Sequence, residues 1–263
     1  MNPKLLSVKV FCDNCEKVVE ASEPAIVHLK KFLINYFSFG RYLELDCDTI
    51  FYSDNLLING MELDNRSELR LLSQGVFENI LSFICSANNN VKRISSMVRF
   101  ISNRFGRSIA EYGGVEYKAF PSITDLSSVK DLEQILRDNK FGYRAKYVAN
   151  AVNQLENLGG NAYLESLKFK SYSECNSELC KISGIGQKVA DCICLMSLGK
   201  YDAVPIDTHM LNFAINHYSF TPKNKNTLSK CEYREVRSMF QKKWGKYAGI
   251  IQLFVFANLL NVY

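Results

Sequence analysis

Lys188 and Asp207 are two residues of this chain whose side chains suit covalent chemistry together. A neutral lysine amine is a nucleophile that attacks an electrophilic carbon and holds it as a covalent intermediate. An ionised carboxylate close by stabilises a developing cation and takes part in proton transfers. The pair therefore predicts attack by the Lys188 amine on a carbon atom, with Asp207 as its electrostatic and proton-transfer partner.

A glycine turn precedes Lys188, and a helical pattern flanks that turn on both sides. Residues 182–186 (ISGIG) contain Gly184 and Gly186, which let the backbone adopt positive φ and approach a partner closely. Beyond the turn, apolar side chains recur at helical spacing, at Val189, Cys192, Ile193 and Met196. We therefore predict a helix-hairpin-helix at 173–198, with Lys188 in the first turn of its second helix.

The start of that second helix favours both a phosphate and a neutral amine. Its unpaired backbone N–H groups and the positive end of the helix dipole attract a phosphate without reading any base, so the hairpin is predicted to clamp a DNA backbone. The same field, together with burial against an apolar helix face, disfavours the ammonium form of Lys188. Asp207 precedes a further apolar-periodic run, which predicts a helix N-cap with an ionised carboxylate.

Each of these features also has a simpler interpretation. A lysine in a first helical turn is commonly solvated, an N-cap aspartate commonly only caps, and Gly-x-Gly turns between helices are frequent. The combination is more specific, because the hairpin, Lys188 and the segment 204–210 (VPIDTHM) follow one another in a fixed order and spacing.

The stretch 179–210 resembles the helix-hairpin-helix DNA glycosylases with a catalytic lysine and, among them, the 8-oxoguanine DNA glycosylase/AP lyase family. The resemblance extends over roughly 72–256 and implies a mainly α, two-lobed helical fold with the extruded nucleotide in the cleft between the lobes. It implies that Lys188 attacks the sugar C1′ and expels the damaged base. The resulting Schiff base then loses a C2′ proton and the 3′ phosphate, which nicks the strand.

Two further segments resemble the DNA-contacting loops of that family. In the asparagine-rich loop at 83–90, Asn88 would fill the hole left by the extruded base, and Arg93 just beyond it would contact the orphaned cytosine. In the wedge segment that follows residue 141, Tyr143 would enter the base stack and Arg144 would be a second cytosine contact, since an arginine fork matches the cytosine acceptors. Taken alone, such residues indicate only a loop and an exposed surface.

The C-terminal segment that begins at 244 (WGKYAG) resembles the family's base pocket. Gln252 would bond the pairing edge of the flipped base and Phe256 would stack on its face; one helical turn separates them, so both can face one cavity. Cys192 matches the family cysteine beside the lysine and the base, and His209 matches a histidine near the DNA phosphate. The simpler alternatives are a glutamine that satisfies a backbone group, a small core cysteine and a structural histidine.

The N-terminal part departs from the family pattern. The resemblance leads us to expect a β-rich domain with a Ser-Gly-Gln segment whose glycine carbonyl reads the N7 hydrogen of 8-oxoguanine, and the sequence contains no such segment. Residues 1–66 predict a reduced segment with a helix and short strands at 5–11 and 17–21, and residues 67–263 predict the helical glycosylase domain. We therefore expect weaker discrimination of 8-oxoguanine from guanine than the family resemblance suggests.

Apolar periodicity predicts helices along the rest of the chain, near 24–38, 67–86, 91–104, 128–138, 144–157, 173–182, 187–198, 208–217, 232–243 and 247–260. The glycines after Tyr112 predict a loop that runs to Pro121. The last helix is apolar, but it is shorter than the roughly 20 residues of a membrane span, and Gln252 interrupts it. It is therefore predicted to be buried in the protein.

The composition agrees with a DNA-binding globular protein. The chain has 263 residues, 47% of them hydrophobic, and a net charge of +5, so it can bury a large core and is mildly attracted to polyanions. Basic side chains gather around the predicted contacts, at Lys92, Arg93, Arg99, Arg104, Arg107, Arg144, Lys146, Lys181 and Lys188, although a solvated face is the alternative.

The cysteines argue for a reducing compartment. Nine are present, and no signal peptide is evident. Cys12 and Cys15 form a single CxxC without a second pair, so no structural zinc is expected. No cofactor is predicted; a monovalent ion held by hairpin carbonyls is implied by the resemblance alone.

The sequence thus predicts a bifunctional DNA glycosylase/AP lyase that excises 8-oxoguanine opposite cytosine. Its partner is double-stranded DNA with a damaged base, and we expect a monomer without membrane attachment, located in the nucleus or, alternatively, in a bacterial cytoplasm. Two other functions stay open. One is a helix-hairpin-helix glycosylase for another damaged base, such as an alkylated or ring-opened purine, and the other is a lesion-binding protein with weak catalysis.

Overall fold

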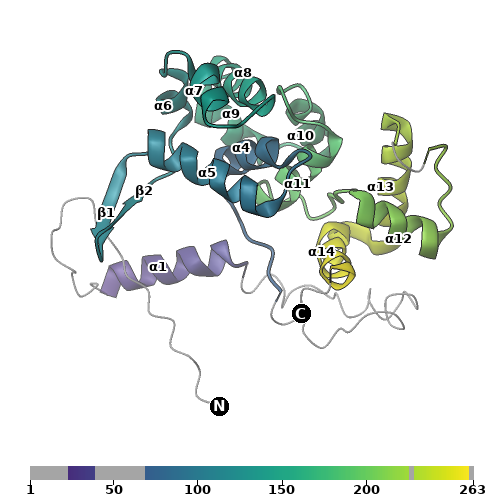
Figure 1. Ribbon diagram of the computed structural model, residues 1–263. Helices are drawn as coiled ribbons and strands as arrows, with labels where there is room; N and C mark the ends of the chain where they lie inside the picture. Colours follow the sequence, from purple (N-terminus) through teal and green to yellow (C-terminus); the bar gives the residue numbers. More distant parts are fainter. Residues whose placement is uncertain (1–22, 39–68, 225–227, 261–263) are drawn as a thin grey trace.

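The computed structural model describes residues 23–38, 69–224 and 228–260. Within them the chain is helical, with one two-stranded antiparallel sheet (Figure 1). The first part contains α1 (Glu23–Tyr36), α4 (Val76–Ser86), α5 (Val91–Phe105), β1 (Ser108–Tyr112), β2 (Val115–Lys118), α6 (Ile123–Ser127) and α7 (Leu132–Asp138). The second contains α8 (Arg144–Asn157), α9 (Gly160–Leu167), α10 (Tyr172–Leu179), α11 (Gln187–Ser197), α12 (Thr208–Tyr218), α13 (Lys230–Trp244), the 3-10 turn η1 (Gly245–Tyr247) and α14 (Ala248–Leu259). The predicted mainly α fold is confirmed.

The helices form two groups, which Figure 1 shows side by side. In the first group, α4 packs against α5, α8 and α11 and buries Ile80, Leu81 and Ile84 almost completely. In the second group, α12 and α13 both pack against α14. The aromatic rings of Phe240 and Trp244, 4.5 Å apart between centroids, form the centre of its core.

The connection between α11 and α12 is bonded to both groups. Lys200 N–H donates to the Cys194 carbonyl of α11 at 3.0 Å. On the other side, the Asp202 carbonyl accepts from Gln241 Nε2 of α13 at 2.7 Å, and the Tyr201 carbonyl accepts from Gly249 N–H of α14 at 2.8 Å. These bonds fix the path of the segment that leads into Asp207.

Three sequence predictions of secondary structure are wrong. The helix predicted from residue 67 begins only at Val76, because Ser73 and Gln74 donate their N–H groups to the distant carbonyls of Tyr36 and Met196. The loop predicted from Tyr112 instead contains the turn and the second strand of a β-hairpin, and the turn glycines at 113 and 114 have φ of +61° and +73°. Such a pair suits the two-residue hairpin turn.

The third error concerns the stretch predicted as one helix at 128–138. The helix observed there, α7, begins only at Leu132, because Asp131 before it adopts a left-handed conformation with φ of +56°. The short helix α6 ends at Ser127, before the predicted range, and was not predicted. Helix α9 was not predicted at all, and at 8 residues it is too short for a clear periodic pattern. The predicted strands at 5–11 and 17–21 and the Cys12-Cys15 pair lie outside the described residues, and the predicted domain boundary stays a prediction.

Two further observations bear on the prediction for the last helix. Helix α14 buries Ile251, Gln252, Phe254 and Val255 inside the protein, as predicted. Among the residues that the structure describes, none of the helices combines the length and the apolar character of a membrane span.

Candidate active site

The hairpin between α10 and α11 depends on its first glycine. Gly184 has φ of +83°, and a Cβ atom there would lie 2.8 Å from the Cβ of Tyr147 on α8. Gly186 differs, since it caps α11 at φ −94° and a Cβ atom would meet nothing within 4 Å. Gly184 therefore serves the packing of the hairpin on α8, whereas Gly186 leaves the start of α11 open to a partner.

Lys188 lies in the first turn of α11, as predicted, and its side chain is half-buried. Its Nζ atom lies 5.5 Å from the centroid of the Phe83 ring on α4. An aromatic face at this distance attracts a cation and restricts the side chain. Phe83 belongs to the asparagine-rich loop segment, but the sequence indicated no role for it.

Asp207 is the N-cap residue of α12, which confirms that prediction. Its Oδ1 atom accepts the N–H of Met210 at 2.9 Å, and its backbone is extended. The bond fixes the carboxylate on the first turn of the helix.

Lys188 and Asp207 line one cavity of about 440 Å³. Its wall comes from the starts of α11, α12 and α13 and includes Gly186, Ile206 and Tyr233. The fold thus brings a lysine from the first helix group and an aspartate from the second to the same space.

The predicted base-pocket residues do not line this cavity. Cys192 is buried one turn beyond Lys188; burial raises the pKa of its thiol to about 11, and the neighbouring Lys188 charge acts in the opposite direction. On α14, Gln252 is buried and Phe256 is half-buried, with its ring 5.8 Å from that of His209 and nearly perpendicular to it. Phe256 therefore lies beside the start of α12.

The predicted wedge and the asparagine-rich loop are bonded to each other. Arg144 is only 3% exposed, and its guanidinium donates from Nε to the Ala87 carbonyl at 3.0 Å and from Nη2 to the Asn88 carbonyl at 2.7 Å. The Tyr143 hydroxyl donates to the same Ala87 carbonyl at 3.0 Å, while its ring stays 49% exposed. Arg93, on the exposed side, donates to the Lys140 carbonyl at 2.8 Å.

The four predicted DNA contacts therefore lie together, yet they differ in their present bonding. Asn88 is exposed with φ of +47°, and Tyr143 and Arg93 are exposed as well. Arg144 uses part of its donor fork on the protein's own backbone. Its predicted contact with cytosine stays a prediction, and any such contact must use the remaining N–H groups.

The sequence analysis missed a buried carboxylate next to the site. Asp191 of α11 is fully buried and accepts bonds from Tyr172, Asn176 and Tyr233. Burial raises the pKa of this carboxyl to about 6, and the charge of Arg237 acts in the opposite direction. An acidic residue inside the apolar stripe after Lys188 is the pattern that could have revealed it.

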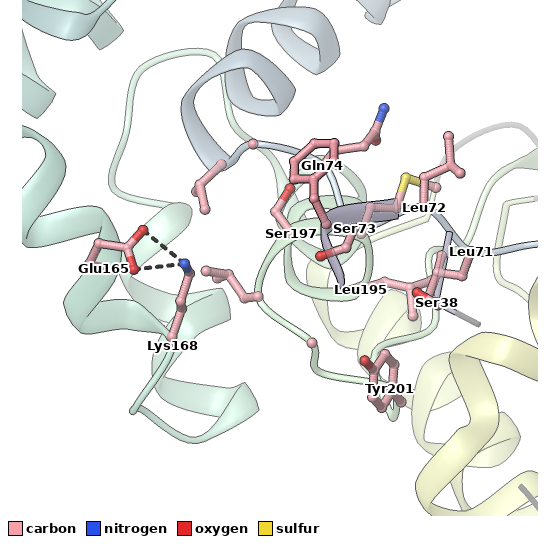
Figure 2. A pocket seen from close by; sticks show the side chains of 16 residues that line it. Ser38, Leu71, Leu72, Ser73, Gln74, Glu165, Lys168, Leu195, Ser197 and Tyr201 are labelled. Atoms are coloured by element: carbon pink, nitrogen blue, oxygen red, sulfur yellow. Dashed lines mark hydrogen bonds and ion pairs between the residues drawn. The ribbon is translucent and has the colours of Figure 1, made fainter. Parts of the chain in front are cut away.

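A second cavity, of about 480 Å³, lies at the far end of α11 and is shown in Figure 2. Ser73, Gln74, Ser197 and Tyr201 are among its lining residues. The Glu165–Lys168 ion pair at its edge measures 2.7 Å, so these charges neutralise each other. None of the residues predicted to carry chemistry lines it, so this cavity is separate from the candidate site.

The chain is similar to a solved structure of 8-oxoguanine glycosylase/lyase from Clostridium acetobutylicum, in complex with double-stranded DNA containing cytosine opposite 8-oxoG. The two are 33% identical with a TM-score of 0.73, over 89% of this chain and 76% of the other. The chain belongs to the 8-oxoguanine glycosylase/lyase family. The predicted membership of this family is therefore confirmed.

Two curated relatives named as N-glycosylase/DNA lyases agree with this result. The N-glycosylase/DNA lyase of Saccharomyces cerevisiae is 34% identical over 245 residues, which cover 83% of this chain and 65% of the relative. The N-glycosylase/DNA lyase OGG1 of Arabidopsis thaliana is 39% identical over 189 residues, which cover 71% of this chain and 51% of the relative. The chain thus spans between half and two thirds of these relatives, and no protein-family model matches it.

Proposed function

We propose that the chain is a bifunctional DNA glycosylase/AP lyase that excises 8-oxoguanine opposite cytosine from double-stranded DNA. The observation that carries the proposal is the cavity shared by Lys188 and Asp207 at the open end of the hairpin helix. The Clostridium relative, solved with DNA containing cytosine opposite 8-oxoG, supports this substrate. The relatives named as N-glycosylase/DNA lyases support the pairing of the two activities.

In the proposed reaction, the Lys188 amine attacks C1′ of the damaged nucleotide, and the bond from C1′ to the base breaks. The base leaves with the electron pair of that bond and takes up a proton, and the lysine nitrogen gives up one of its protons. The C1′–O4′ bond of the sugar then breaks, O4′ takes up a proton, and the nitrogen electron pair forms the C=N bond of the protonated Schiff base. The Asp207 carboxylate stabilises positive charge on the sugar during this step. Removal of a C2′ proton then expels the 3′ phosphate and nicks the strand.

The remaining site residues recognise the DNA in this proposal. The backbone at Gly184 and Gly186 and the side chain of His209 bind phosphates, and the exposed Tyr143 enters the base stack. Two further sets of residues recognise the bases. Asn88, Arg93 and Arg144 face the cytosine, and Cys192, Gln252 and Phe256 hold the extruded base.

The proposal needs no bound cofactor, because a lysine amine, a carboxylate and water supply every group that the reaction uses. We also propose that the enzyme acts as a monomer, since one chain contributes both Lys188 and Asp207 to the cavity. The proposal also includes a nuclear location, which the yeast and Arabidopsis relatives support.

Borohydride trapping tests the proposal. A duplex with 8-oxoguanine opposite cytosine is incubated with protein and borohydride, which reduces a Schiff base to a stable covalent complex. We expect a trapped complex with the unaltered chain and none with Lys188→Gln, which also loses base release but still binds DNA. The matched control is Lys181→Gln, since Lys181 is an exposed hairpin lysine whose amine lies 3.0 Å from Glu178.

Two results would overturn the proposal. Trapping by Lys188→Gln at the level of the control would show that another amine attacks the sugar. Release of an alkylated or ring-opened purine, but not of 8-oxoguanine, in parallel reactions would assign the chain to another lesion.

A further inference from the structure

A buried carboxylate on the hairpin helix joins three helices next to the candidate site. Asp191 accepts the Tyr172 hydroxyl at 2.6 Å and the Asn176 side-chain amide at 2.7 Å, both from α10. From α13 it accepts the Tyr233 hydroxyl at 2.8 Å, and Arg237 Nη1 lies 3.5 Å from it. Four donors therefore converge on one carboxyl group that has no contact with solvent.

The Tyr233 hydroxyl continues this network to the segment before Asp207. Its oxygen accepts the backbone N–H of Ile206 at 3.1 Å, in a buried bond. An ionised carboxylate can only accept, so the hydroxyl hydrogen must point to Asp191 and the oxygen lone pair must receive the amide. The bonds run in one direction, from the Ile206 amide through the hydroxyl to the carboxylate.

This chain of bonds connects the two residues of the proposed reaction. Lys188 and Asp191 share helix α11, whose own backbone bonds hold them at a fixed separation. Ile206 is adjacent to Asp207, so the Tyr233 hydroxyl reaches the backbone that carries the second carboxylate. The cap bond to Met210 fixes Asp207 on α12, but it does not fix α12 relative to α11.

We infer that Asp191 and Tyr233 are positioning residues that hold Asp207 at its working distance from Lys188. This inference rests on the proposed function. A shift of the order of 1 Å between reacting groups is enough to slow an enzyme strongly, so the bond to the Ile206 amide acts on the rate of the reaction.

Stability alone does not account for the network. A buried carboxylate loses its hydration, and well-packed apolar residues in its place commonly give an equally stable core. Here the oxygens of the carboxylate are instead shared among hydroxyl and amide donors from two other helices, with Arg237 farther away. Such a network specifies one geometry for the groups that it joins.

Tyr233 lies in the first turn of α13, and the N-terminus of this helix is capped. Ser229 and Glu232 form a capping box, in which the Ser229 side chain accepts from Glu232 N–H and the Glu232 carboxylate accepts from Ser229 N–H. The Tyr233 ring is buried directly after it. Its hydroxyl is therefore directed at Asp191 and Ile206 by the packing of α13 itself.

Two tyrosines allow a matched test. Tyr233→Phe and Tyr172→Phe each remove one hydroxyl donor from Asp191, but only Tyr233→Phe also removes the acceptor of the Ile206 amide. Single-turnover excision of 8-oxoguanine at saturating enzyme is measured well below both melting temperatures. We expect Tyr233→Phe to slow excision by about tenfold and Tyr172→Phe by less than about twofold, with unchanged affinity for a duplex containing an abasic-site analogue.

Hydrogen–deuterium exchange of residues 203–207 gives a second readout that does not depend on catalysis. The Ile206 amide hydrogen should exchange faster in Tyr233→Phe than in the unaltered chain. In Tyr172→Phe its exchange rate should be unchanged. Equal slowing of excision by both variants, or unchanged excision and exchange in Tyr233→Phe, would overturn the inference. If the unaltered chain releases no base, the proposed function fails, and the exchange experiment alone then decides whether Tyr233 holds this segment.

Discussion

At the scale of single residues, Asp207 has two tasks that one substitution can separate. As the N-cap of α12 it accepts the Met210 amide, and as a charged group it is proposed to stabilise the sugar cation. Asparagine caps a helix about as well as aspartate but carries no charge. Asp207→Asn should therefore unfold at nearly the same temperature and excise base at least about a hundredfold more slowly.

Thermal denaturation and single-turnover excision measure the two effects. Asp207→Ala is the control, because it removes both the cap and the charge and should lose stability as well as rate. Full excision activity in Asp207→Asn would limit this residue to capping.

Much of the candidate site follows from the local sequence, and the rest does not. The positions of Lys188 and Asp207 in first helical turns are set by neighbouring residues, so pattern and capping rules locate them correctly. The partners of Asp191 come from α10 and α13, which only the tertiary fold brings together. Arg144 was expected to face DNA, and its bonds to the loop carbonyls result from the contact of two segments far apart in sequence.

At the scale of elements, we expect opposite effects from alanine substitutions at the two glycines of the hairpin between α10 and α11. A methyl group at Gly186 meets no protein atom, and the φ of −94° suits alanine, so Gly186→Ala should leave stability unchanged. The methyl group would stand where we propose that a phosphate approaches the open helix start, so affinity for undamaged duplex should fall by about tenfold. Fluorescence anisotropy with a labelled duplex measures this loss.

Gly184→Ala is the contrasting variant in the same hairpin. Its positive φ and the 2.8 Å approach to Tyr147 should lower the unfolding free energy by about 1–3 kcal/mol. If Gly186→Ala binds duplex DNA as well as the unaltered chain, the hairpin backbone does not contact phosphate.

Element boundaries were predictable where local rules act alone. The prediction of a helix at 144–157 matches α8, and that at 187–198 matches α11 within one residue. The extended stretch before Val76 was missed because its backbone bonds are made with distant residues. The hairpin of β1 and β2 was missed although its paired glycines are the expected sequence feature of such a turn.

At the scale of the whole molecule, the two helix groups should unfold as one cooperative unit. The segment after α11 is bonded to both groups, and the Asp191 network joins α11 to α13. Trp244 is the single tryptophan of the chain and lies buried in the second group. Its fluorescence therefore reports on that group, while far-ultraviolet circular dichroism reports on all helices.

Urea denaturation followed by both methods should give one common midpoint, as expected of a two-state transition. A fluorescence midpoint clearly below the dichroism midpoint would show that the second group unfolds first. In that case the bonds around the connecting segment do not couple the groups.

In the proposed function, the bonds that Arg144 makes to the Ala87 and Asn88 carbonyls have a consequence for the search along DNA. They hold the loop and the wedge in shape while the protein is free, so the entropy of ordering these segments is lost once, during folding, and not at every encounter. A repair enzyme meets an enormous excess of normal base pairs. In the proposed function, the loop and the wedge meet each base pair already in shape. We therefore expect the time spent at each pair to depend on how readily that pair opens and not on rearrangement of the protein.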